Sequence, residues 1–215
     1  MPVSDPAVSD PTVPDPAEPV LTLSIDAAHH GPRQVLGAFG LSLERGEVMA
    51  VCGPSGVGKS TLLRIVAGLH TGFTGHRHVA GRLAMVFQEP TLLPWRSALD
   101  NIRLPAGCSA ENARARLAEV GLAGREDDSP AALSLGQQRR LALARAMAAR
   151  PDLLLLDEPF VSLDPALVDG MMDLVAGLQA RHGFAAMLVT HARAEADRLA
   201  RRTLWLDGAP ARPVQ

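Results

Sequence analysis

Lysine is almost absent from this chain of 215 residues, in which a single lysine, Lys59, stands against twenty arginines. Tyrosine is missing and aromatic residues make up only 3%, so aliphatic side chains must fill the core. The net charge of −2 at pH 7 excludes a nucleic-acid surface built on bulk positive charge. We therefore expect no nucleic-acid partner.

Cysteine is scarce, and long hydrophobic runs are missing. Cys52 and Cys108 are too few for a disulfide framework and lack the spacing of a metal site. Cys52 ends an apolar run and is expected to be a small buried residue. No uncharged apolar run approaches the roughly 18 residues of a membrane span, and the acidic, proline-rich N-terminus is unlike a signal peptide. These absences predict a cytoplasmic protein.

The chain divides into a tail and a folded domain. In residues 1–19 an Asp-Pro pair recurs every five residues, at Asp5, Asp10 and Asp15. Such a segment buries too little apolar surface to offset its ordering entropy, so we expect a disordered acidic, proline-rich tail. Residues 20–215 are predicted to form one folded domain.

Hydrophobic periodicity places strands and helices in the domain. Alternation predicts a strand over 20–25, and a further strand is expected over 35–43. Continuous apolar runs predict buried strands at 48–52, 153–156 and 187–189, and amphipathic patterns predict helices at 59–69, 109–120, 136–149 and 165–183. Buried strands separated by helices indicate an α/β fold with a parallel sheet, whose strand ends carry Asp157 and His191 at one edge.

The single lysine closes a glycine loop with the pattern G-x-x-x-x-G-K-S, between a buried strand and a helix. Glycines let backbone N–H groups turn inward around an anion, and a compact ammonium fits between β- and γ-phosphates where a planar guanidinium does not. The pattern predicts binding of a nucleoside triphosphate, with the Ser60 hydroxyl on Mg²⁺. The predicted nucleotide-binding residues are Gly53, Pro54, Ser55, Gly56, Val57, Gly58, Lys59, Ser60 and Thr61.

Two carboxylates, Asp157 and Glu158, follow the run of four leucines that ends at Leu156. Carboxylates are costly at the exit of a buried strand unless they serve a purpose. Asp157 is expected to hold Mg²⁺, through water, and Glu158 to polarise the attacking water. The alternative is a capping pair before Pro159.

With further motifs in the same order, the chain resembles the ATP-binding cassette (ABC) ATPases over residues 20–206. These motifs are Gln88 in 86–90, Leu133 to Gln137, Ser162 to Asp164, and His191. The resemblance implies a P-loop NTPase core with a parallel sheet, an N-terminal antiparallel β subdomain and an inserted helical subdomain at about 90–148. It also implies ATP and Mg²⁺ as ligands.

The resemblance assigns roles to these residues. Gln88 would contact Mg²⁺ and couple to a membrane subunit, His191 would touch the γ-phosphate, and Asp164 would lie in a dimer contact. The signature residues Ser134, Leu135, Gly136 and Gln137 would meet the γ-phosphate on the opposite subunit. Leu135 stands where the family usually has glycine, and its Cβ narrows the allowed backbone angles, which puts the catalytic rate in doubt.

Two further assignments have open alternatives. His30 falls where the family has an aromatic residue that stacks on adenine, with His29 beside it, or it is an exposed turn histidine. The segment from Gln88 to Trp95 is similar to the nitrate, sulfonate and taurine importer ATPases. Trp95 with residues 92–93 would then dock a helix of the membrane subunit, or would pack within the helical subdomain.

Arginines gather on the helix at 136–149. Arg139, Arg140 and Arg145 are expected on a solvated or salt-bridged face of that helix, although the same residues would also suit nucleic-acid contact.

The sequence thus predicts the ATP-hydrolysing subunit of an ABC transporter, an importer of a small solute such as a nitrate- or sulfonate-type anion. The resemblance implies a homodimer or paired ABC subunit, transmembrane permease subunits, a solute-binding protein and a place on the inner face of the cell membrane. The alternatives are an ABC ATPase without a transport role and a weakly hydrolysing ATP-binding scaffold. The transported substrate is not encoded in this chain.

Overall fold

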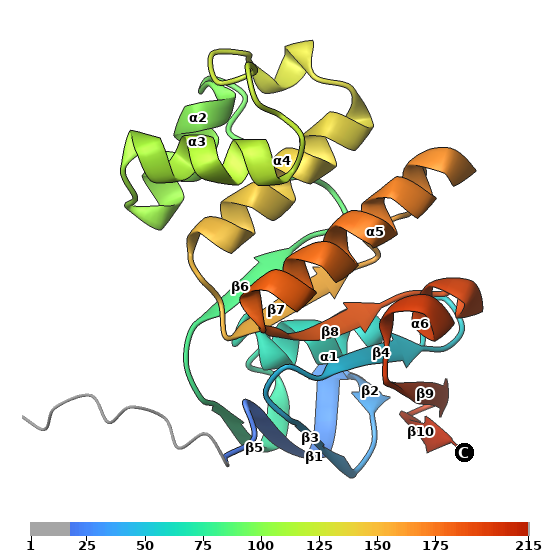
Figure 1. The fold of residues 1–215 in the computed structure, drawn as a ribbon. Coiled ribbons are helices and arrows are strands. Elements are labelled where there is room, and N and C mark those ends of the chain that lie inside the picture. Colours follow the sequence, from blue (N-terminus) through green and yellow to red (C-terminus); the bar gives the residue numbers. More distant parts are fainter. Residues whose placement is uncertain (1–17, 215) are drawn as a thin grey trace, which may run out of the picture.

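The computed structural model describes residues 18–214, and Figure 1 shows their arrangement around one large sheet. The predicted disordered tail at 1–19 lies almost wholly outside the described residues. Among those residues, no helix combines the length and the apolar character needed to cross a membrane.

Ten strands form one mixed sheet in the order β3-β1-β2-β10-β9-β4-β8-β7-β6, with β5 paired to β1. Within the run β9-β4-β8-β7-β6 every pair of neighbouring strands is parallel, whereas β9 is antiparallel to β10. The strands are β1 Leu21–His30, β2 Arg33–Leu36, β3 Phe39–Leu43, β4 Val48–Cys52, β5 Phe73–Val79, β6 Leu83–Val86, β7 Leu153–Asp157, β8 Ala185–Val189, β9 Arg202–Gly208 and β10 Ala211–Val214. The predicted parallel α/β core is confirmed.

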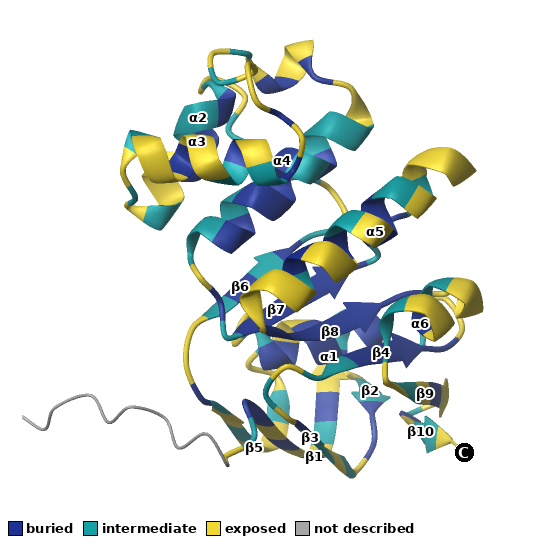
Figure 2. Ribbon diagram, viewed as in Figure 1, coloured by how far each residue is buried: buried dark blue, intermediate teal, exposed yellow. Residues whose placement is uncertain are grey.

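Strands β4, β7 and β8 are buried on both faces, as their continuous apolar runs predicted, and Figure 2 shows them as the buried centre of the molecule. Along β7, alternate side chains enter different cores. Leu153 and Leu155 pack on the side of helix α1, while Leu154 and Leu156 pack on the side of α4 and α5. Cys52 is buried, as expected.

Antiparallel strands at the N-terminal end extend the sheet. Strand β1 pairs with β2, β3 and β5, all antiparallel. The single strand expected over 35–43 is wrong, because the chain leaves β1 after Leu36, where the Gly37 N–H donates to the Ala211 carbonyl of β10, and pairs with β1 again only from Phe39. Residues 33–36 and 39–43 are therefore separate strands on the same side of β1.

Six α-helices accompany the strands in the described chain, together with a 3₁₀ turn at Pro130–Ala132. The helix predicted over 59–69 ends earlier, at Val66, because Gly68 adopts a left-handed backbone with φ of 74°. Leu69, expected on its apolar face, is 61% exposed. The helices are α1 Lys59–Val66, α2 Ala98–Ala106, α3 Ala110–Glu119, α4 Leu135–Ala148, α5 Pro165–His182 and α6 Arg193–Leu199.

Helices α2, α3 and α4 gather beyond the β6 edge of the sheet (Figure 1). Their N-caps are serines: Ser97, Ser109 and Ser134 each accept a backbone hydrogen bond. The helices at 109–120 and 136–149 are confirmed to within a residue at each end, and α2 was not foreseen. That residues 90–148 form a distinct helical subdomain remains a prediction.

The arginines of α4 do not form the expected solvated or salt-bridged face. Arg139 is only 5% exposed, and its Nη1 donates to the Pro159 carbonyl at 2.6 Å. Arg145 donates to the carbonyl of Thr91 at 2.8 Å. Both side chains tie α4 to neighbouring loops, so the expectation is wrong for these two residues.

Candidate nucleotide-binding site

The glycine loop joins β4 to α1, as predicted, and its backbone requires glycine. Gly53, Gly56 and Gly58 have φ values of 146°, 74° and 119°, which side-chain-bearing residues rarely adopt. A Cβ on Gly58 would also lie 2.8 Å from a methyl carbon of Leu36 and 2.9 Å from one of Val35. Strand β2 therefore packs directly against the loop and helps to fix its shape.

Lys59 lies inside this loop and is only 4% exposed. Its Nζ donates hydrogen bonds to the carbonyl oxygens of Gly53 at 2.9 Å and Pro54 at 3.0 Å. A buried ammonium needs such partners, and here they hold it at the wall of a cleft. The ammonium is thus positioned as a point charge at the start of a helix, where an anion is already favoured.

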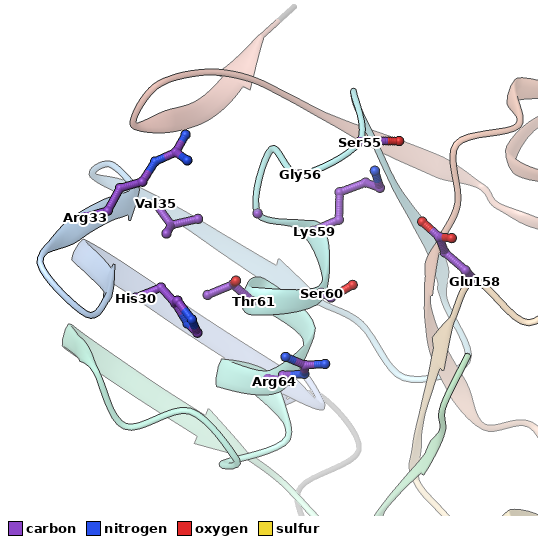
Figure 3. Close-up of a pocket in the computed structure, with 11 residues that line it drawn as sticks. His30, Arg33, Val35, Ser55, Gly56, Lys59, Ser60, Thr61, Arg64 and Glu158 are labelled. Carbon is purple, nitrogen blue, oxygen red and sulfur yellow. The ribbon is translucent and has the colours of Figure 1, made fainter. Parts of the chain in front are cut away.

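A cleft of about 380 Å³ opens beside Lys59. Figure 3 shows Lys59 and Ser60 on the loop and helix side, Glu158 facing them, and His30 and Arg33 reaching in from β1 and β2. The predicted site residues that line it are His30, Ser55, Gly56, Gly58, Lys59, Ser60, Thr61 and Glu158. The cleft is therefore built from four separate parts of the chain.

Three residues of the cleft were missed: Arg33, Val35 and Arg64. Arg64 follows Ser60 by one helical turn, so helical spacing offered a signal for it. Arg33 pairs with His30 across the β1–β2 turn, a register that the sequence did not reveal. The two arginines add positive charge to the cleft.

Ser60 lines the cleft, and its hydroxyl donates to Oδ1 of Asp157, which does not line it, at 2.9 Å. Asp157 is 4% exposed, and burial raises the pKa of its carboxyl above the ordinary value, although the Ser60 hydrogen bond and the charge of Arg64 oppose the rise. Among the described residues, this hydroxyl is its one hydrogen-bond donor. A buried carboxylate with a single hydrogen-bond donor is stabilised in its ionised form when a cation binds nearby.

Glu158 follows Asp157 but turns away from the strand. Its φ is 46°, a left-handed value that costs a non-glycine residue about 1–3 kcal/mol. One carboxylate oxygen lies 3.9 Å from Nδ1 of His191. The strained backbone thus aims the Glu158 side chain across the cleft, toward the side where β8 ends.

His191 follows β8 and Gln88 follows β6, the two strands that flank β7, at the edge of the sheet where these strands end. Val86 pairs with Leu156, and Val189 pairs with Asp157, so both residues leave the sheet beside Glu158. The structure thus brings His191 to this edge as predicted, and Gln88 lies there as well. Neither lines the cleft itself.

The signature residues lie elsewhere, at the start of α4. Ser134 accepts from the Gln137 N–H at 3.3 Å, and the Gln137 side chain accepts from the Ser134 N–H at 2.9 Å, which is a capping box. Leu135 is the first helical residue, is 42% exposed and has no positive φ. The leucine therefore causes no backbone strain here, and Ser134–Gln137 do not reach the cleft of their own chain.

The segment expected to dock a membrane subunit is exposed in part. Trp95 is 74% exposed, whereas Leu92 packs against the core of the helices. The side-chain amide of Asn101, which is fully buried, bonds Leu93 and Arg96 and holds the loop in place. Leu92 is thus partly buried, as the alternative of packing within the helical region predicted, and Trp95 is the exposed apolar side chain of this segment.

Fold and cleft together define a nucleotide-binding protein of the phosphate-loop type, and comparisons with known proteins agree. The family model described as ABC transporter matches residues 36–161. The ATP-binding cassette MJ0796, in a dimeric post-hydrolysis structure bound to ADP and Pi, superposes with a TM-score of 0.78, covering 91% of this chain and 99% of that chain at 26% identity.

Curated relatives are more similar in sequence. An aliphatic sulfonates import ATP-binding protein of Paraburkholderia xenovorans is 49% identical over 83% of this chain, and the match spans 54% of that protein. Proteins of the same description from Burkholderia lata and Mycobacterium avium are 45% and 46% identical over 91% and 83% of this chain, spanning 76% and 74% of those proteins. The chain belongs to the ABC transporter family, as an ATP-binding ATPase.

Proposed function

We propose that this chain is the ATP-hydrolysing subunit of an ABC importer for a small sulfonate- or nitrate-type anion. The observation that carries the proposal is Lys59, the single lysine of the chain, held by loop carbonyls at the wall of the cleft. Three relatives, each described as an aliphatic sulfonates import ATP-binding protein, support import and the class of solute. We assign selection of that solute to other subunits of the transporter.

In the proposed mechanism, loop amides and Lys59 hold the triphosphate, and His30 or His29 stacks on adenine. Glu158 orients a water for in-line attack on the γ-phosphate, and His191 steadies that phosphate from the end of β8. Positioning and electrostatic stabilisation account for most of the rate gain in phosphoryl transfer. The strained backbone of Glu158 serves this positioning, because it holds the carboxylate facing the loop.

The site fits Mg²⁺. The Ser60 hydroxyl and the buried Asp157 carboxylate are hard oxygen donors 2.9 Å apart, and the described residues contain no cluster of three or more metal-binding side chains. Such a sparse donor set suits Mg²⁺, which takes much of its coordination from phosphates and water. Ser60 and Gln88 would hold the ion directly and Asp157 through water, and the ion would neutralise phosphate charge.

The signature residues support a dimer. Ser134 and Gly136 lie at the exposed start of α4, away from the cleft of their own chain. We infer that two copies sandwich two ATP molecules head to tail, so that each α4 N-terminus meets the γ-phosphate bound by the other copy. Asp164, which caps α5 by accepting from the Leu167 N–H, would lie near the same contact.

Closing and opening of the sandwich would move permease subunits on the inner face of the membrane, with Trp95 as an apolar contact. A solute-binding protein would complete the system.

Purification from membranes tests this proposal. A permease that co-purifies with the chain, together with Mg²⁺-dependent phosphate release from ATP, is the expected result. Phosphate release without any membrane partner would favour an ABC ATPase outside transport, and ATP binding without release would favour a scaffold.

A further inference from the structure

Three arginines line a pair of adjoining cavities near the amino ends of β6 and β7, at the end of the parallel sheet opposite to the phosphate loop. The cavities measure about 330 and 380 Å³ and share Arg82, Arg116 and Arg150. Arg82 directly precedes β6, and Arg150 lies shortly before β7. The phosphate loop follows the carboxyl end of β4, at the opposite end of the same parallel sheet, and a strand of five residues alone spans about 16 Å.

The carboxylates near these arginines already have partners. Asp152 accepts from the backbone N–H of Arg82 at 2.7 Å and lies 3.6 Å from Nη1 of Arg45. Glu119 is held by Arg116 and lies 3.2 Å from His182. Within residues 18–214, the guanidinium groups of Arg82 and Arg150 form neither a hydrogen bond nor an ion pair. Their donors are free for a ligand.

Helix dipoles alone do not account for these free donors. Helices α2 and α4 end beside the cavities, and helix C-termini attract cations. An arginine that only capped such an end would donate to its carbonyl groups, as Arg140 does to Val120 at the end of α3, with a distance of 3.2 Å. Neither Arg82 nor Arg150 makes a bond of this kind in the described structure.

We propose that Arg82, Arg116 and Arg150 bind a doubly charged oxyanion of the phosphate type, either inorganic phosphate or the phosphate group of a small organic molecule. Guanidinium groups bind phosphate oxygens in pairs of parallel hydrogen bonds. Each cavity also falls within the size range of small-molecule sites. Arg116 comes from α3 and the other two from strand ends, so the anion connects the helical region to the sheet.

Calorimetric titration of the full chain with inorganic phosphate and with glycerol phosphate tests this site. A saturating non-hydrolysable ATP analogue is present throughout, so that the nucleotide site, including the position of the γ-phosphate, does not bind the probe. Wild-type protein is expected to bind one equivalent. Arg82→Gln combined with Arg150→Gln is expected to weaken binding by about ten-fold or more, the effect of losing one or two charged hydrogen bonds.

Arg114→Gln is the matched control, because Arg114 is exposed on the same helix as Arg116, lines neither cavity and makes no hydrogen bond or ion pair among the described residues. It is expected to bind like wild type. Arg150→Gly is a second test that retains the fold, because Arg150 has φ of 50°, which suits glycine. It too is expected to weaken binding.

Tighter binding of glycerol phosphate than of inorganic phosphate identifies an organic phosphate as the ligand, and equal binding identifies free phosphate. The proposal is overturned if wild-type protein binds neither probe at millimolar concentration, or if Arg82→Gln with Arg150→Gln and Arg150→Gly all bind as tightly as wild type.

Discussion

The hydroxyl of Ser60 donates a 2.9 Å hydrogen bond to Asp157, which stands 97 residues further along the chain. This bond joins the helix after the phosphate loop to the end of β7. It sets a hydroxyl and a buried carboxylate side by side where a phosphate-bound Mg²⁺ is proposed. The next residue, Glu158, is then close enough to face the same ligand.

Replacing Asp157 tests the cost of this buried carboxylate. Burial raises the pKa of Asp157 above its ordinary value of 3.8, so the folded chain binds a proton here more readily than the unfolded chain. The stability contributed by protonation is therefore present below pH 3.8 and is lost as pH rises through the folded pKa. Asp157→Asn should raise the free energy of unfolding at neutral pH, measured by urea denaturation without nucleotide or Mg²⁺.

In the same variant, the free energy of unfolding should fall less than in wild type as pH rises from acid to neutral. The variant should also bind ATP more weakly in the presence of Mg²⁺. Asp127→Asn is the control, because Asp127 is exposed and makes no hydrogen bond in the described structure. If Asp157→Asn instead lowered the free energy of unfolding at neutral pH, the prediction would be wrong. The interactions of the ionised carboxylate in the nucleotide-free protein would then outweigh the cost of burying it.

Glu158→Gln tests the residue proposed to orient water. The amide retains size but cannot accept the proton, so steady-state phosphate release should fall by about 10²–10⁴-fold, while ATP binding persists and an ATP-bound dimer accumulates. Glu111→Gln, at an exposed position in the first turn of α3, should leave the rate unchanged. Unaltered turnover in Glu158→Gln would refute the role.

Gly58→Ala and Gly177→Ala form a contrasting pair. Alanine at Gly58 must adopt φ of 119° and meets Leu36 and Val35 at under 3 Å, so it should destabilise the fold by more than about 1 kcal/mol and weaken nucleotide binding. Gly177 lies in α5 with no atom within 4 Å of a new Cβ, and alanine there should stabilise by about 0.5–1 kcal/mol. Denaturant titration measures both, and equal effects would contradict the loop geometry.

Leu135→Gly tests the departure in the signature sequence. Leu135 begins α4 without backbone strain, so glycine there has no strain to relieve. Because glycine has a low helix propensity, it should lower the free energy of unfolding by up to about 1 kcal/mol. The backbone N–H is retained in both forms, so we expect ATP hydrolysis to continue at a similar rate. A marked acceleration in Leu135→Gly would instead show that the leucine side chain obstructs the closed dimer.

The sequence predicted those parts of the fold that have a local signal. Strands β4 and β7 are continuous apolar runs, and the glycine loop has a fixed spacing before Lys59. Strand β5 was missed because Phe73–Val79 includes two histidines and an arginine, and its pairing with β1 supplies what its composition lacks. Helix α2 was missed although Ser97 with Asp100 is a capping signal.

Features that depend on tertiary contacts escaped prediction. Arg139 was expected to be solvated, but it is buried and donates to the Pro159 carbonyl, 20 residues further along the chain. Arg33 lines the cleft because the register of β1 and β2 pairs it with His30. Leu69 was expected on the apolar face of α1, but it lies beyond the helix because the left-handed backbone of Gly68 ends the helix before it. Sequence periodicity records which residues are apolar, but it does not record which distant backbone group each side chain meets.

Nucleotide affinity of wild-type protein and of Lys59→Ala, compared by equilibrium titration with Mg²⁺ and ATP, tests the account most directly. The structure places the Lys59 ammonium 2.9 Å from the Gly53 carbonyl at the wall of the cleft. We predict micromolar-to-millimolar binding by the wild type and a loss of about ten-fold or more in the variant. Equal affinity of the two proteins, or no binding by the wild type, would contradict the account.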